Sequence, residues 1–232
     1  MQAPGFPKTV SRPSPADAGG IPWTPLAHRF RPFFSPRRFR YRRRSSASTA
    51  IPRGRPPADW LVGKTGSGSP SWAVEADPSA PSRPHVLRQS GAATFAWAVK
   101  PGALLADGFV EVKFRPLSGR QDQAGGVVWR WKDGDNYYVA RANALENNVS
   151  LYYTERGTRR TLKYVDAPVP RGVWQTLRVE FAGTNVKVFL DGVKRIDLDD
   201  AHIAGSGAVG VWTKADSVTL FDDFGFGPPA AR

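Results

Sequence analysis

Two segments of the chain combine aromatic rings with charged and amide side chains, which is the chemistry of a surface that binds sugars. They are residues 124–153 and 207–227, and both are rich in Trp, Tyr or Phe as well as in Arg, Lys, Asn or Asp. Aromatic faces pack against apolar faces of a ligand, and hydrogen-bonding groups fix its orientation. The two segments therefore predict a class of ligand, carbohydrate, more directly than they predict a reaction.

Acidic residues of these segments are the candidates for catalysis. A retaining glycosidase needs two carboxyl groups about 5–5.5 Å apart. The acids are Asp133, Asp135, Glu146, Asp216, Asp222 and Asp223. We favour turn capping and solvation for most of them, since residues 132–136 (Lys-Asp-Gly-Asp-Asn) have turn composition. If the protein is an enzyme, we expect Glu146 and Asp216 to be its catalytic acids.

The chain has little capacity for metal or thiol chemistry. It contains no cysteine and three histidines, so thiolate sites and His-rich zinc sites are not expected. Calcium takes oxygen ligands, and the adjacent carboxylates of Asp222 and Asp223 make a structural calcium ion an alternative. We favour a role at the strand end for this pair, and we expect no cofactor.

Charge divides the chain into a basic head and a nearly neutral domain. Residues 1–58 contain twelve Lys and Arg and one acid, whereas residues 59–232 contain 21 Lys and Arg and 19 acids. Frequent prolines and the absence of apolar periodicity predict a disordered head over 1–58. The run at 37–44 (Arg-Arg-Phe-Arg-Tyr-Arg-Arg-Arg) suits nucleic acid in principle, although such blocks are usually solvated tails. We therefore regard nucleic-acid binding as a minor alternative.

From residue 59 onward the pattern is that of β-strands. In residues 109–115, Val110, Val112 and Phe114 alternate with charged residues, which indicates a half-buried strand. Asp191-Gly192 between two such runs predicts a tight hairpin. Further strands are expected at 71–76, 84–89, 92–99, 126–132, 136–142, 148–155, 159–165, 177–181, 185–190, 193–198, 207–213 and 217–226. The fold class is therefore all-β, an antiparallel two-sheet sandwich over 59–228 with a tail at 229–232, and no segment is apolar enough to span a membrane.

The same alternation nominates a ligand-binding face. Val209 and Val211 suit the core, so Trp212 and Lys214 should point to the opposite face. Burying an unpaired charge is costly, so Arg130 and Arg141 should also avoid the core. The predicted ligand-binding residues are Arg130, Arg141, Asn143, Trp212 and Lys214. We expect Trp129, Trp131 and Trp174 to fill the core, and Trp212 is evenly balanced between core and ligand.

Several motifs resemble a known family. Residues 172–179 (Gly-Val-Trp-Gln-Thr-Leu-Arg-Val) followed by 186–192 (Val-Lys-Val-Phe-Leu-Asp-Gly) are similar to the core of laminin-G/concanavalin A-like jelly rolls. Residues 135–143 and 209–223 resemble bacterial 3-keto-disaccharide hydrolase-like, or family 16 glycoside hydrolase-like, domains. The resemblance implies a concanavalin A-like jelly roll and an extracellular or periplasmic location, although this chain shows no recognisable signal peptide.

The chain also departs from this family. Family 16 enzymes carry a Glu-x-Asp-x-x-Glu strand, and the nearest fragment here, Glu75-Ala-Asp77, is followed by proline. Relatives often open with a strand that pairs with the terminal Phe-Asp-Asp strand, and its absence predicts an exposed edge beside 217–226. We therefore expect a non-catalytic carbohydrate-binding or interaction module, with a 3-keto-disaccharide hydrolase-like enzyme as the alternative.

Overall fold

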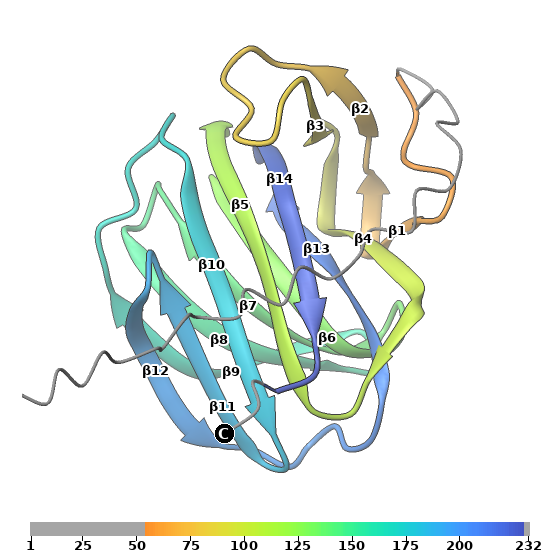
Figure 1. The fold of residues 1–232 in the computed structure, drawn as a ribbon, viewed down its shortest axis with the longest axis vertical. Coiled ribbons are helices and arrows are strands. Elements are labelled where there is room, and N and C mark those ends of the chain that lie inside the picture. Colours follow the sequence, from red (N-terminus) through yellow and green to blue (C-terminus); the bar gives the residue numbers. More distant parts are fainter. Residues whose placement is uncertain (1–53, 230–232) are drawn as a thin grey trace, which may run out of the picture. The chain divides into compact units, whose positions relative to one another are not determined.

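The computed structural model describes residues 54–229 as two seven-stranded antiparallel β-sheets packed face to face (Figure 1). Residues 1–53 and 230–232 lie outside the described part, and so does almost all of the predicted basic head. The described residues contain no helix long and apolar enough for a membrane span. The predicted all-β, two-sheet sandwich is confirmed.

The first sheet has the strand order β1-β4-β13-β6-β7-β8-β9. Its strands are β1 (Leu61–Ser69), β4 (Ala92–Leu105), β13 (Gly207–Ala215), β6 (Ala124–Asp133), β7 (Asn136–Asn143), β8 (Asn148–Glu155) and β9 (Thr158–Asp166). The second sheet has the order β12-β11-β10-β5-β14-β3-β2. Its strands are β12 (Val193–Asp199), β11 (Asn185–Leu190), β10 (Gln175–Ala182), β5 (Gly108–Ser118), β14 (Val218–Gly227), β3 (His85–Gln89) and β2 (Trp72–Ala76).

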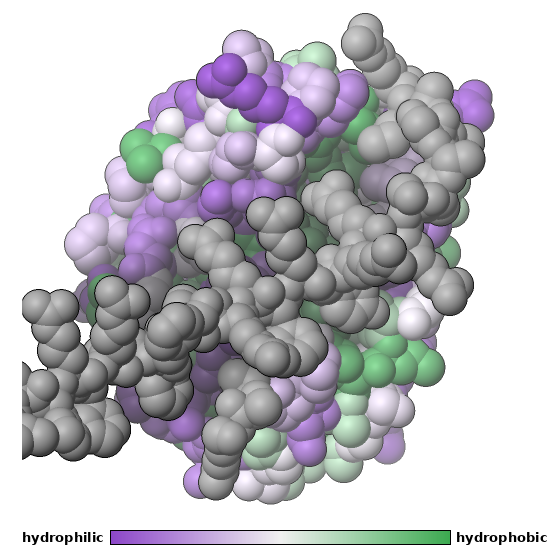
Figure 2. Space-filling view, in the orientation of Figure 1, coloured by the Kyte–Doolittle hydropathy of each residue, from purple (hydrophilic) through white to green (hydrophobic). Residues whose placement is uncertain are grey.

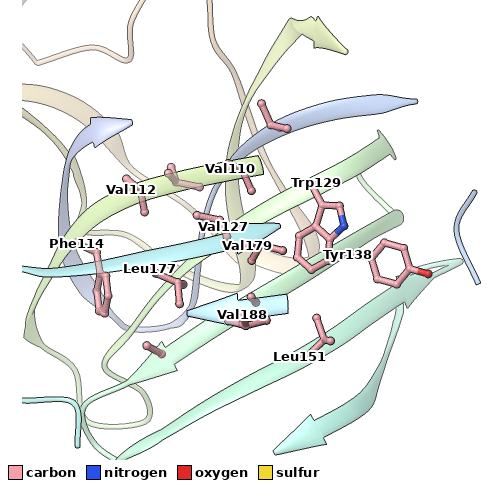
Figure 3. Close-up of a cluster of buried hydrophobic side chains, with 14 of the residues drawn as sticks. Val110, Val112, Phe114, Val127, Trp129, Tyr138, Leu151, Leu177, Val179 and Val188 are labelled. Carbon is pink, nitrogen blue, oxygen red and sulfur yellow. The ribbon is translucent and has the colours of Figure 1, made fainter. Parts of the chain in front are cut away.

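The main hydrophobic core lies between the two sheets (Figure 3). The second sheet contributes Val110, Val112 and Phe114 from β5, all without solvent exposure, as their alternation predicts. The first sheet contributes Trp129 and Tyr138, whose rings stack with centroids 5.2 Å apart. Period-two alternation therefore gives each sheet one core face and one outer face.

The predicted hairpin at Asp191-Gly192 joins β11 to β12. Both residues have positive φ, 50° at Asp191 and 77° at Gly192. A two-residue turn of this kind needs positive φ at both positions, and Asp and Gly adopt it most readily.

Strand β1 was not predicted from the sequence. Its segment contains three glycines and three hydroxyl residues among nine, and it shows no clear alternation. It becomes a strand because it pairs along β4, from Leu61 opposite Val99 to Ser69 opposite Ala92. Pairing with a neighbour thus compensates for weak intrinsic strand propensity.

The exposed edge predicted beside residues 217–226 is wrong for the first part of the strand, whereas no strand of residues 54–229 pairs with residues 222–227 on that side. Strand β14 lies inside the second sheet, with β5 on one side and β3 on the other. Thr219, Leu220 and Phe221 of β14 pair with residues 89, 88 and 87 of β3. The β2–β3 hairpin supplies the neighbour that relatives obtain from an opening strand.

The outer face of the second sheet combines charged side chains with a few partly exposed rings, among them Phe109, on which Arg178 packs at 4.0 Å. On β10 the core residues Leu177 and Val179 alternate with the half-buried Arg178 and Glu180. In Figure 2, which views the molecule from this side, hydrophilic residues prevail over the region of β10 and β12 that grey atoms leave visible. This face is built like an ordinary solvated surface.

Candidate functional site

The outer face of the first sheet differs from that surface, because it contains a second hydrophobic cluster. Val209 and Val211 of β13 lie in the main core, whereas Trp212 lies on the opposite face, in the direction predicted. We call the group on this face the outer aromatic cluster. Its members are Trp97, Val99, Ala124, Val128, Tyr137, Val139, Tyr152 and Trp212, with Phe95 and Trp131 packed against them.

Trp212 is fully buried within this cluster. Phe95 stacks on it with ring centroids 5.4 Å apart. The predicted orientation of Trp212 is therefore right, but its ring presents no free surface to a ligand. In this structure Trp212 forms the floor of the face.

The outer face of the first sheet is concave. Arg159 of β9 has its guanidinium carbon 4.7 Å from the centre of the Phe95 ring of β4. Five strand spacings separate β4 from β9, which would place them about 24 Å apart in a flat sheet. The two side chains can meet only because the sheet curves around the outer aromatic cluster.

A buried polar network lies on the same face, and we call it the Arg141 cluster. Its members are Asp122, Arg141, Asn143, Glu146, Asn148 and Lys214. Arg141 donates to Asp122 at 3.2 Å, to Glu146 at 2.6 Å and to Asn148 at 3.2 Å. The ammonium of Lys214 lies 2.8 Å from the same carboxylate of Asp122. Two of the predicted residues, Arg141 and Lys214, are thus brought together through Asp122. Asn143 follows on the same face of β7, opposite Asn148, but its side-chain oxygen accepts the backbone N–H groups of Gln123 and Leu145.

Three polar atoms of the Arg141 cluster lack hydrogen-bond partners in the described part of the chain. Asp122 Oδ1, Arg141 Nε and Asn143 Nδ2 are buried and have no hydrogen-bond partner within residues 54–229. Each such group costs free energy, because it has lost water without gaining a partner. Orphaned polar atoms gathered at one place are the expected signature of a site completed by water or by a ligand.

Two carboxyl groups of the Arg141 cluster have opposite pKa shifts. Burial raises the pKa of Asp122, and the charges of Arg141 and Lys214 only partly oppose this. Burial also acts on Glu146, but the hydrogen bond from Asn148 and the charge of Arg141 outweigh it and lower the pKa of Glu146. The site therefore favours an ionised Glu146 beside Arg141, with a half-exposed carboxylate that can accept hydrogen bonds.

Asp216, the other predicted catalytic acid, holds a loop. Its carboxylate accepts the backbone N–H groups of Arg120 at 2.7 Å, Gln121 at 2.9 Å and Asp122 at 3.2 Å. Burial opposes its ionisation, yet these three N–H groups lower the pKa of Asp216. Asp216 thus positions Asp122 in the Arg141 cluster, and its carboxylate is already committed to the backbone.

Arg130 is the one predicted residue that the structure places elsewhere. A β-bulge interrupts the pairing of β6 with β13, and Arg130 adopts a left-handed φ of 47° there. Its guanidinium turns to the end of the sandwich, where it donates to the carbonyls of Ala106, Ile203 and Gly183. The prediction that Arg130 shares a face with Arg141 is wrong, because strict alternation does not survive a bulge.

The predicted place of Trp131 in the core is also wrong, because of the same bulge. Without it, Trp129 and Trp131 would share the core face. Trp129 does lie in the main core, but Trp131 packs edge-on against Trp97 of the outer aromatic cluster, at 5.3 Å. Trp174 is only partly buried and packs against a small satellite cluster, so its expected place in the main core is also not observed.

Asp222 and Asp223 each contact a different protein group. Asp222 accepts hydrogen bonds from the hydroxyl of Ser82 and from its backbone N–H at 2.7 Å. Asp223 pairs with Lys113 at 2.7 Å. Residues 54–229 hold no group of three or more Asp, Glu or His side chains able to bind a metal ion. Structural calcium stays an untested prediction without support from these contacts.

A pocket of about 480 Å³ adjoins the Arg141 cluster. It lies between β1, β4 and β13, and Phe95, Gln121, Lys214 and Asp216 contribute to its lining. Its volume falls within the roughly 300–1,000 Å³ of sites for small molecules. Because Lys214 belongs to both, the pocket and the Arg141 cluster form one continuous surface.

Three residues of the face were not predicted as site residues. Asp122 lies in a loop two residues before the aromatic-rich segment, and only its hydrogen bonds to Asp216 bring it to Arg141. Arg159 and Tyr164 lie on β9, opposite Thr154 and Ser150 of the outer face. Alternation along the predicted strand 159–165 could have placed Arg159 on this face. A bulge between Arg159 and Tyr164 puts both side chains on the same face, whereas strict alternation would place them on opposite faces.

Comparisons with known proteins identify the fold. No protein-family model and no curated protein matches the sequence. Among solved structures, the chain is similar to carbohydrate-binding module CBM66 from Bacillus subtilis, with 20% identity and a TM-score of 0.60 over 72% of this chain and 94% of that one. A Bacillus subtilis protein of unknown function with a galectin-like fold has 13% identity and a TM-score of 0.55, covering 75% and 91%.

An enzyme shares the same architecture. A family 16 glycoside hydrolase from a mixed-linkage glucan locus of Bacteroides ovatus has 9% identity and a TM-score of 0.51, over 72% of this chain and 94% of that one. At such identities the likeness establishes the fold alone. The expected concanavalin A-like jelly roll is therefore confirmed, and that fold includes both binding modules and hydrolases.

Proposed function

We propose that this protein is a carbohydrate-binding module whose ligand occupies the concave outer face of the first sheet. The observation that carries the proposal is the Arg141 cluster, with three buried polar atoms that lack partners beside aromatic rings and a pocket of about 480 Å³. The similar structures support it, because one of them is itself named a carbohydrate-binding module.

Each part of the face suits a different part of a sugar. Glu146 and Lys214 are half exposed, so they can reach ring hydroxyl groups as acceptor and donor. Tyr164 contacts Glu146 and is 47% exposed, which leaves its ring free to pack on a sugar. We therefore assign stacking to Tyr164 and Phe95, and a supporting role to the buried Trp212.

The protonation states of the carboxyl groups on this face suit sugar binding better than hydrolysis. A retaining mechanism needs one carboxyl group that keeps its proton and can deliver it to the leaving group. Asp122 has the raised pKa, but it is fully buried beneath Arg141 and Lys214. Glu146 and Asp216 both have lowered pKa values, which suits hydrogen-bond acceptors.

A glycan array with the full-length chain tests the proposal. We expect at least one glycan to bind, with affinity reduced at least tenfold by Lys214→Met and by Tyr164→Ala. Lys163→Met is the matched control, because Lys163 is an exposed lysine of the same sheet that lies opposite the core residue Leu151. Binding that survives both changes, or the lack of any glycan signal, would refute the proposal.

The enzymatic alternative has its own test. Release of sugar from a 3-keto-glucoside, abolished by Glu146→Gln, would replace the binding module with a hydrolase. The nucleic-acid alternative rests on the basic residues 1–58, nearly all of which lie outside the described part. It predicts steeply salt-dependent affinity for an oligonucleotide that does not change in Lys214→Met.

A further inference from the structure

Arg159 is the one cation of the concave face that has no partner in the described structure. Arg141 and Lys214 both contact Asp122. The guanidinium of Arg159 makes no hydrogen bond and no salt bridge within residues 54–229, and its Nη1 atom is buried. Burial lowers its pKa, and the nearby charge of Arg141 adds to this effect.

Aromatic rings surround this guanidinium. Its central carbon lies 4.1 Å from the centre of the Tyr152 ring, 4.7 Å from that of Phe95 and 5.7 Å from that of Trp212. Cation–π attraction offsets part of the cost of removing the charge from water. The rings cannot satisfy the N–H groups, which form a planar fork that matches the two oxygens of a carboxylate.

The charge balance of the face points the same way. Arg141, Lys214 and Arg159 are positive, whereas Asp122 and Glu146 are the carboxylates that face them. The two carboxylates are therefore engaged by Arg141 and Lys214, and no carboxylate of residues 54–229 forms a salt bridge with Arg159. A ligand with one carboxylate would neutralise the charge of Arg159.

We propose that the ligand is an acidic sugar, a uronate residue whose carboxylate pairs with Arg159 between the rings of Phe95 and Tyr152. This inference rests on the proposed function and specifies its ligand class. The hydroxyl groups of the same sugar face Glu146, Tyr164 and Lys214, and the adjoining pocket accommodates the next residue of an oligosaccharide. Arg159 is then a binding residue, and its aromatic surroundings exclude water from the ion pair.

Methyl esterification provides the matched ligands, because it removes the charge of a uronate and leaves the ring and its hydroxyl groups in place. Oligomers of galacturonate, glucuronate and mannuronate, each as the free acid and as the methyl ester, are titrated calorimetrically into the full-length chain at physiological salt. We expect at least one free acid to bind at least tenfold more tightly than its ester. In Arg159→Gln this preference should fall to near unity, with the affinity for the ester retained.

The basic residues 1–58 will attract any polyanion, and Arg159→Gln separates this contribution. A preference for the acid that persists in Arg159→Gln, or esters that bind the original chain as tightly as acids, would overturn the inference. Arg159→Lys keeps the charge but not the fork, so it should retain part of the preference. Arg159→Gln loses the cation–π contacts with Tyr152 and Phe95 but no hydrogen bond or salt bridge of residues 54–229, so it should lower the unfolding temperature by a few degrees at most.

The two proposals fail in different ways. Binding of neutral glycans that depends on Lys214 and Tyr164, with no preference for acids, would leave the binding module intact and remove the acidic ligand. Absence of binding by every glycan, neutral or acidic, would remove both.

Discussion

The outer faces of the two sheets each hold an arginine between two carboxylates, and the two arrangements differ in burial. Arg178 on the second sheet pairs with Glu180 at 2.9 Å and Glu111 at 3.5 Å, and its side chain is 27% exposed. Arg141 on the first sheet pairs with Asp122 and Glu146, and its side chain is 2% exposed. The same residue types therefore form a solvated surface pair in one place and a desolvated cluster in the other.

This difference in burial indicates which of the two arginine clusters is the better candidate for a functional site. Exposed pairs contribute little to stability, and buried pairs often contribute nothing over an apolar replacement. A smaller pocket, of about 180 Å³, lies on the second sheet beside Phe109 and Arg178. No lining residue of either pocket has a buried polar atom without a partner within 54–229, but the Arg141 cluster beside the larger pocket has three such atoms. Arg178, Glu111 and Glu180 have no such atom, and this difference is why the proposed ligand site is placed at the Arg141 cluster.

The largest expected effect is a difference between Arg141 and Arg178 in their contribution to the free energy of unfolding. Arg141→Met leaves the carboxylate of Asp122 buried with Lys214 as its only charged partner, so we expect a loss of about 3–5 kcal/mol in the free energy of unfolding. Arg178→Met should cost about 1 kcal/mol or less. Equilibrium unfolding in urea measures both, and equal losses would abolish the distinction drawn between the two faces.

Arg130 provides a third case, since it is nearly as buried as Arg141. Its partners at the end of the sandwich are three backbone carbonyls and the partly exposed carboxylate of Asp107 at 3.4 Å. Arg130→Met leaves the carbonyls of Ala106, Ile203 and Gly183 without this donor, which should cost about 3 kcal/mol. Glycan affinity should stay unchanged, because the β-bulge turns Arg130 away from the concave face. A tenfold weaker glycan affinity in a folded Arg130→Met variant would contradict this placement.

A smaller effect, which depends on pH, is expected on the free energy of unfolding when Asp216 no longer holds the loop that positions Asp122. The folded pKa of Asp216 is lowered, so its contribution is complete above the unfolded value of about 3.9 and is lost as pH falls through the folded pKa. Asp216→Asn should therefore cost about 1–2 kcal/mol at pH 7, and the difference from the original chain should begin to shrink as pH falls below about 3.9.

Unfolding free energies of both proteins across this pH range provide the measurement. A difference that stays constant from pH 7 to pH 3 would show that the charge of Asp216 does not hold the loop. Asp199→Asn is a suitable control, because Asp199 is exposed on the edge strand β12, accepts one hydrogen bond at 3.3 Å from the Thr184 hydroxyl and forms no salt bridge within residues 54–229.

The sequence by itself determined the fold class and much of the orientation of the side chains. Alternation along a strand is a local property, so Val211 and Trp212 could be assigned to opposite faces, as could Ala142 and Arg141. The Asp191-Gly192 turn is equally local, because its φ requirements depend on those two residues. The resemblance to jelly rolls implied two packed antiparallel sheets, but the order of the strands within each sheet came from the structure.

Only the tertiary structure decided which charges meet. The bulge at Arg130 depends on how β6 pairs with β13, and no pattern of residue types within β6 specifies it. Asp122 joins Arg141 because Asp216, 94 residues later, binds its loop. Arg159 reaches Phe95 because the sheet curves across five strand spacings. These contacts join residues far apart in sequence, so the sequence alone could not predict the concave face or the unpaired guanidinium of Arg159.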